Sequence, residues 1–102
     1  MLSYLKELLT SNPFISSLDL SNRGITVLDP HSVQLLARFT ELRRLDLSDN
    51  QLRRLPADLT PLQQVVEFDL NGNPLEDVEG AVDALQGMPS LRALRINLHE
   101  ED

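Results

Sequence analysis

Three aspartates occur in the same short setting, each between two apolar residues: Asp19 in Leu-Asp-Leu, Asp46 in Leu-Asp-Leu and Asp69 in Phe-Asp-Leu. Alternating apolar and polar residues are typical of a short β-strand that buries one side. If the three strands lie side by side in register, their carboxylates form a column with a spacing of about 4.8 Å. Such a column could attract a cation or a basic peptide segment.

The other residue types argue against a metal centre or a catalytic site. No 12-residue loop has the central Gly and terminal Glu of a Ca²⁺ site. The chain has no cysteine, and its two histidines, His31 and His99, fall in different segments. It contains no Gly-x-Ser-x-Gly, and residues 71–75 (NGNPL) lack the glycines and lysine of a phosphate-binding loop. We therefore expect no enzyme activity, no cofactor and no bound metal.

The leucines, which make up 22 of the 102 residues, predict the elements that position the aspartates. One pattern recurs, with apolar residues at positions 1, 4, 6 and 11 and Asn favoured at position 9. Its copies start at residues 15, 42, 65 and 91, and the fourth is incomplete. Positions 4 and 6 point to the same side of a strand, so successive copies stack into one core. The Asn can pair with backbone groups that would otherwise be buried without a partner. Position 9 reads Arg23, Asn50, Asn73 and His99, so the two end copies depart from the pattern.

The segments LRRLDLSDNQLRRLP (42–56) and VVEFDLNGNPLEDV (65–78) resemble the leucine-rich repeat family. The resemblance covers residues 15–102 and implies an α/β fold. That fold is a right-handed solenoid, with short parallel strands on its concave face and helices or 3₁₀ turns on its convex face. The resemblance also implies a non-enzymatic protein-binding module. The uneven coils are similar to the intracellular branch of the family, which includes phosphatase-regulatory subunits, axonemal dynein light chains and centrosomal or ciliary scaffolds.

The segments that connect the strands predict different local structures. Residues 29–39 and 76–91 carry apolar residues at helical spacing. Pro30 suits the start of the first helix, and Gly87 and Pro89 suit the end of the second. Residues 56–62 contain two prolines and are too short for much helix, so we expect a 3₁₀ turn there.

The two ends of the stack of coils differ. Residues 2–9 place four leucines on one helix face before Ser11, Asn12 and Pro13 end the helix. We expect residues 1–14 to cap the N-terminal end of a repeat domain spanning residues 15–102. The fourth coil has a strand but no returning segment. This predicts either the N-terminal fragment of a longer protein or an edge that another molecule covers.

Charge and hydropathy narrow the class of partner. Lysine and arginine number 9 against 16 acidic residues, and the net charge of −7 opposes binding to nucleic acid or to anionic membranes. Lys6 and Glu7 interrupt the N-terminal apolar stretch, so we do not expect it to be a signal peptide, and no segment approaches 18 uncharged apolar residues. With the lack of cysteine, these features favour a cytoplasmic protein, and the resemblance adds cytoskeletal or ciliary association.

The residues between the core positions form columns on the predicted concave face. Position 5 reads Asp19, Asp46, Asp69 and Arg95, and position 3 reads Ser17, Arg44, Glu67 and Ala93. From these columns and their flanking positions we expect protein contacts by Asp19, Arg43, Arg44, Asp46, Asp49, Glu67, Asp69, Arg92 and Arg95.

Two interpretations of the aspartate column stay open. In the first, the column binds a basic segment of a partner protein. In the second, Leu-Asp-Leu-Ser is a common filler of this repeat, and Arg43, Arg44 and Arg95 pair with the acids. Function has alternatives too: a scaffold that self-associates through its open C-terminal edge, or a regulatory subunit that holds a phosphatase against the concave face.

Overall fold

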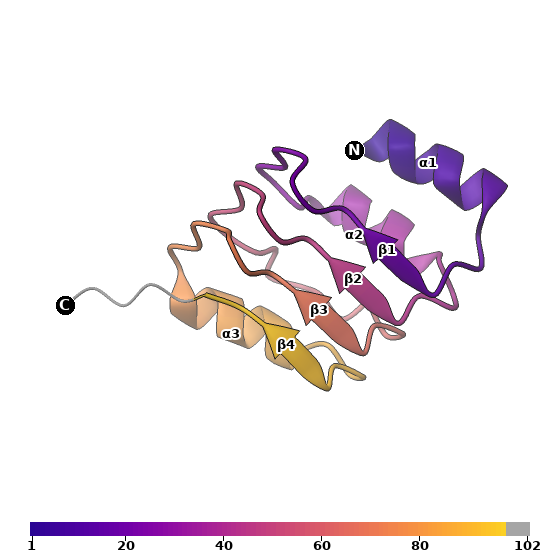
Figure 1. Cartoon of the computed structure of the whole chain (residues 1–102). Coiled ribbons are helices and arrows are strands. Elements are labelled where there is room, and N and C mark those ends of the chain that lie inside the picture. The colour runs from indigo at the N-terminus through magenta and orange to yellow at the C-terminus, as the bar shows by residue number, and fades with distance from the viewer. Residues whose placement is uncertain (98–102) are drawn as a thin grey trace.

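The computed structural model describes residues 1–97, so His99 and its place in the Asn series lie outside the described residues. The elements in chain order are α1 (Leu2–Ser11), β1 (Ser17–Asp19), α2 (Pro30–Ala37), β2 (Arg44–Asp46), β3 (Glu67–Asp69), α3 (Val78–Gln86) and β4 (Ala93–Arg95). The strands form one parallel sheet in the order β1-β2-β3-β4. Figure 1 shows them side by side, with α2 and α3 behind the sheet. The expected α/β fold with short parallel strands is confirmed.

The register of the sheet follows the leucine spacing. Leu18 pairs with Leu45, Leu45 with Phe68, and Phe68 with Leu94. The same register places Asp19 opposite Asp46, Asp46 opposite Asp69, and Asp69 opposite Arg95. The predicted aspartate column is therefore present in the sheet.

The core lies between the sheet and the connecting segments. Leu20, Leu47 and Leu70, at position 6 of their coils, are fully buried, and the connecting segments contribute buried residues such as Leu36 and Phe39. Because one short strand has little to bury alone, each coil depends on its neighbours for a closed core.

Buried asparagines satisfy the backbone where each coil leaves its strand. The amide nitrogen of Asn50 donates to the carbonyls of Leu20 and Leu47, and its Oδ1 accepts from the N–H of Arg23 and Ile25. Asn73 repeats this arrangement one coil later with Leu47, Leu70 and Leu52. The predicted pairing of these asparagines with backbone groups is confirmed.

Local sequence explains where the helices begin. Asp29 caps α2 by accepting a hydrogen bond from the N–H of Ser32 at 2.7 Å, and Pro30 occupies the first turn, where no N–H is needed. Asp77 caps α3 through the N–H of Gly80 at 3.0 Å. At the β1 end of the sheet, α1 packs against α2 and buries Leu5 completely (Figure 1).

The prediction of a 3₁₀ turn over residues 56–62 is only partly right. The segment consists of bends and turns without a 3₁₀ helix, although the N–H of Leu62 donates to the carbonyl of Leu59 at 3.0 Å, which is one bond of 3₁₀ type. Pro56 and Pro61 have no N–H to extend that bonding. The segment is held instead by Leu59 and Leu62, both fully buried.

Candidate functional site

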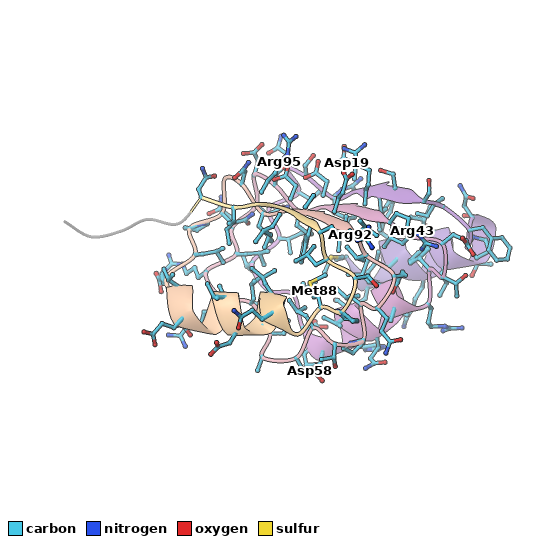
Figure 2. All side chains as sticks on the ribbon, turned by 90° about the horizontal axis from the view of Figure 1, so that it is seen from below. Asp19, Arg43, Asp58, Met88, Arg92 and Arg95 are labelled. Atoms are coloured by element: carbon cyan, nitrogen blue, oxygen red, sulfur yellow. The ribbon has the colours of Figure 1, made fainter. Side chains whose placement is uncertain are left out.

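A shallow hollow of about 400 Å³ lies over the four strands. Besides Leu45 and Phe68, whose side chains are buried, eight residues line this hollow, and we call them the sheet face: Ser17, Asp19, Arg44, Asp46, Glu67, Asp69, Ala93 and Arg95. Figure 2 shows Asp19 and Arg95 on the side of the sheet away from α3, whereas Asp58 lies on the helix side. Positions 3 and 5 point to this side because positions 4 and 6 of the first three coils are buried in the core, and β4 follows the same alternation.

The sheet face brings together six of the nine expected contact residues: Asp19, Arg44, Asp46, Glu67, Asp69 and Arg95. The other three do not line the hollow. Arg43 and Arg92 lie one residue before their strands, and the guanidinium of Arg43 is 3.6 Å from the carboxylate of Glu41. Asp49 lies in the turn after β2, where its backbone is left-handed with φ 55°.

Each aspartate of the column closes a turn at the end of its strand. The Oδ1 atoms of Asp19, Asp46 and Asp69 accept from the backbone N–H two residues later, at 2.9, 2.9 and 3.0 Å. Turns of this kind need one side-chain oxygen. Within residues 1–97 the hydrogen bonds of Asp46 and Asp69 use Oδ1 alone, which leaves Oδ2 of each available to a ligand, whereas Asp19 also accepts from the Ser21 hydroxyl.

The turn also affects the ionisation of Asp19. The pKa of Asp19 is lowered chiefly by a hydrogen bond from the Ser21 hydroxyl, and further by the Ser21 backbone N–H. Partial desolvation opposes this shift, and the charge of Arg23 adds to it weakly. The carboxylate at the β1 end of the column is therefore held in its charged form.

Arginines neutralise the glutamate of the sheet face, whereas the described ion pairs do not include the aspartate column. Nε of Arg44 lies 2.8 Å from Oε2 of Glu67, its neighbour across the strands. The expectation that arginines pair with acids is thus right for Arg44 and for Arg43, but their partners are glutamates. Arg95 is the register neighbour of Asp69, and no ion pair of Arg95 is found in the part of the chain that the structure describes.

The geometry suits contact with a polypeptide better than chemistry in a closed pocket. The hollow is open, and its column of carboxylates in neighbouring strands offers several charges to one polypeptide segment laid across the sheet. Across residues 1–97, no three His, Asp or Glu side chains come close enough together to hold a metal ion. Among the same residues, no helix has the length and apolar character needed to cross a membrane.

Sequence reasoning missed several contacts near the sheet face. The turn bonds of the aspartates have a signal in the sequence, because each aspartate is followed two residues later by Ser or Asn in a turn. Asn97 accepts from the N–H of Gly72 at 2.7 Å and joins the last two coils. The guanidinium of Arg23 stacks on the ring of Tyr4 at 4.6 Å, which links the first coil to α1. No local pattern announces these two contacts.

Repeated coils with a strand, a buried asparagine at the turn and a returning segment define a repeat protein. The chain belongs to the leucine-rich repeat family, since the family model for leucine rich repeat matches residues 13–75. Proteins of this family are generally non-enzymatic, and membership suggests a protein-interaction module.

Comparison with solved structures adds several structural relatives. The chain is similar to a chain in the solved structure described as that of Chaetomium Mex67:Mtr2 subunits, with a TM-score of 0.64 and 26% sequence identity. The similarity covers 90% of this chain and 68% of that one. No curated protein matches the sequence.

Proposed function

We propose that this chain is a non-enzymatic protein-interaction module, and that its sheet face binds a basic segment of a partner protein. The observation that carries the proposal is the column of Asp19, Asp46 and Asp69 in register, in which Asp46 and Asp69 each keep one oxygen that accepts no hydrogen bond within residues 1–97. A segment that carries several Lys or Arg residues could bond these oxygens, because the long and flexible basic side chains can adjust to the spacing of about 4.8 Å between strands.

The turns at the strand ends do not require the charge of the aspartates. An asparagine at the same position would offer the same Oδ1 acceptor to the following N–H. Three carboxylates in neighbouring strands repel one another, and like charges directly opposite destabilise a sheet. The filler interpretation explains the turn, whereas partner binding also explains why the residue is charged.

Further parts of the proposal concern how the face is presented. The coils wind as a right-handed solenoid from residue 15 through β4, with the sheet face concave, and residues 1–14 cap its first coil. The burial of Leu5 against the core and the position of α1 at the β1 end support the cap. The name of the structural relative describes a complex of two subunits, which supports protein binding as the role of the fold. A cytoplasmic location follows the resemblance to intracellular members.

The test is partner capture with charge-neutral variants. Wild-type chain on a support should retain proteins that the double variant Asp46→Asn/Asp69→Asn releases, because the variant keeps both turn bonds and loses two charges. Asp58→Asn/Asp83→Asn is the matched control: it makes the same charge change, with Asp58 on the helix side (Figure 2) and Asp83 on α3. Equal capture by all three proteins would contradict the proposal.

A further inference from the structure

The hydrogen bonds between coils follow a series that stops at β4. In each pair of coils, the N–H at position 6 donates to the carbonyl at position 5 of the next strand: Leu20 to Asp46 (2.8 Å), Leu47 to Asp69 (2.8 Å) and Leu70 to Arg95 (2.7 Å). The next donor in this series is the N–H of Ile96. Within residues 1–97 it has no backbone acceptor.

A second series ends at the same strand. The carbonyl at position 2 accepts two N–H groups of the next coil: Ser16 from Arg43 and Arg44, Arg43 from Val66 and Glu67, and Val66 from Arg92 and Ala93. The next acceptor is the carbonyl of Arg92, for which the described part of the chain supplies no donor. The edge of β4 therefore presents the N–H of Ile96 and the carbonyl of Arg92 in the same arrangement that joins each of the three earlier pairs of neighbouring coils.

An apolar hollow accompanies this free edge. It has a volume of about 290 Å³ and lies between α3 and β4, where it is lined by Val82, Leu85, Gln86, Met88, Leu91 and Leu94. Leu94 is 40% exposed, whereas its row neighbours Leu18, Leu45 and Phe68 are 4, 2 and 1% exposed. Leu94 covers its register neighbour Phe68, but within residues 1–97 no residue covers Leu94 in the same way.

The charge of Arg95 indicates which residue type would follow the apolar residue that covers Leu94. Arg95 replaces aspartate in the fourth strand of the column, and it has a single register neighbour, Asp69. A strand added beyond β4 would place its own position 5 next to Arg95. An acidic residue there would be attracted to the guanidinium.

We propose that the free edge of β4 and the adjoining hollow bind an extended segment of a partner protein that adds parallel to β4. The segment has an apolar–acidic–apolar pattern. Its first apolar residue covers Leu94, its acidic residue faces Arg95, and its backbone bonds the carbonyl of Arg92 and the N–H of Ile96. This docking surface adjoins the sheet face and shares Arg95 with it, but it lies beyond the edge of β4 and its partner has the opposite charge.

A second copy of the chain fits this surface less well. Two copies related by a twofold axis would pair β4 antiparallel, with Leu94 opposite Leu94. The two Arg95 side chains would then take diagonal positions about 7–8 Å apart, where like charges repel. In end-to-end stacking, the incoming β4 would meet the end of the sheet where α1 lies (Figure 1).

A synthetic peptide with the sequence of residues 65–78 (VVEFDLNGNPLEDV) is a suitable probe. It carries the pattern as Phe-Asp-Leu and is acidic without basic residues, so the sheet face does not attract it. Added to the full chain, it should bind and should slow hydrogen exchange at the amide of Ile96 as the site saturates. The Asp→Asn version at its Phe-Asp-Leu motif should bind about two- to fivefold more weakly, as expected for a partly exposed ion pair.

A charge exchange tests the assigned register. Arg95→Glu should weaken binding of the natural peptide, and a peptide with Arg in place of the central aspartate should restore it. Failure of the natural peptide to bind, or binding that leaves exchange at Ile96 unchanged, would overturn the proposal. Light scattering tests the alternative occupant. A concentration-dependent dimer that excess peptide does not dissociate would assign the edge of β4 to a second copy of the chain and would also overturn the proposal.

Discussion

Replacing Asp46 with asparagine is expected to stabilise the folded chain. Asp46 lies between Asp19 and Asp69 in the register of the sheet, so its carboxylate has a like charge on each side. Its Oδ1 accepts the N–H of Ser48 at 2.9 Å, and asparagine offers the same acceptor. The variant Asp46→Asn therefore keeps the turn and removes the repulsion.

The size of the gain follows from the strand spacing. Unit charges about 4.8 Å apart repel by about 0.9 kcal/mol in bulk water, so Asp69 alone accounts for a gain of this order in Asp46→Asn. In a domain of this size, such a change raises the unfolding temperature by about 4 °C or more. High salt should reduce the difference, because the Debye length falls from about 10 Å at 0.1 M to about 3 Å at 1 M.

Thermal unfolding at low salt and at 1 M salt measures this effect. Asp58→Asn is the control, because Asp58 accepts the N–H of Thr60 at 2.9 Å in the same kind of turn but lies outside the column. It should show no gain in stability and no such salt dependence. The reasoning is refuted if Asp46→Asn destabilises the chain, or if its gain is the same at both salt concentrations.

Three further predictions concern the scaffold. Asn50→Ala should lower the free energy of unfolding by about 3 kcal/mol in urea titrations, because buried backbone groups lose their hydrogen-bond partners. The control Gln51→Ala, at an exposed neighbouring residue, should change it by less than about 0.5 kcal/mol. Gly24 and Gly72 both have positive φ, but a methyl group at Gly72 would collide with the Asp49 side chain, whereas at Gly24 it would meet open space. Gly24→Ala should therefore lower the free energy of unfolding by about 1 kcal/mol, and Gly72→Ala should lower it by more. The pKa of Asp29 is lowered mainly by the hydrogen bond from the backbone N–H of Ser32 that it caps. The ionised carboxylate therefore stabilises the folded chain fully above the ordinary aspartate pKa of 3.8, and this stabilisation is lost as the pH falls below that value. Unfolding curves of Asp29→Asn should thus be less sensitive to acid than those of the wild type.

The sequence allowed the main features of the fold and the column to be predicted, because leucine spacing determines register. Coils that start at residues 15, 42 and 65 leave one arrangement that buries positions 4 and 6 of all three, and this arrangement aligns Asp19, Asp46 and Asp69. The same spacing did not distinguish residues on the sheet face from those at its margin. Arg43 and Arg92 lie one residue before a strand, and such residues need not share the direction of the strand side chains.

Two features depended on details that spacing does not contain. Whether an arginine pairs with a glutamate or with an aspartate is decided by side-chain length and by competition with the turns; Glu67 reaches Arg44, whereas Asp46 is held by its own turn. Residues 56–62 have a composition that excludes a long helix, but the particular bends depend on how Leu59 and Leu62 reach the core. Tertiary packing decided both outcomes.

The central claim is that the sheet face binds a basic segment of a protein through its aspartate column. The most direct measurement is an NMR titration of the chain with an arginine-rich peptide, observed at the amides of Ser21, Ser48 and Asn71, which are hydrogen-bonded to the three column carboxylates. Binding through the column should give saturable shifts at these amides in the wild type, and much weaker ones in Asp46→Asn/Asp69→Asn. Shifts confined to other surfaces, or equal shifts in the double variant, would contradict it.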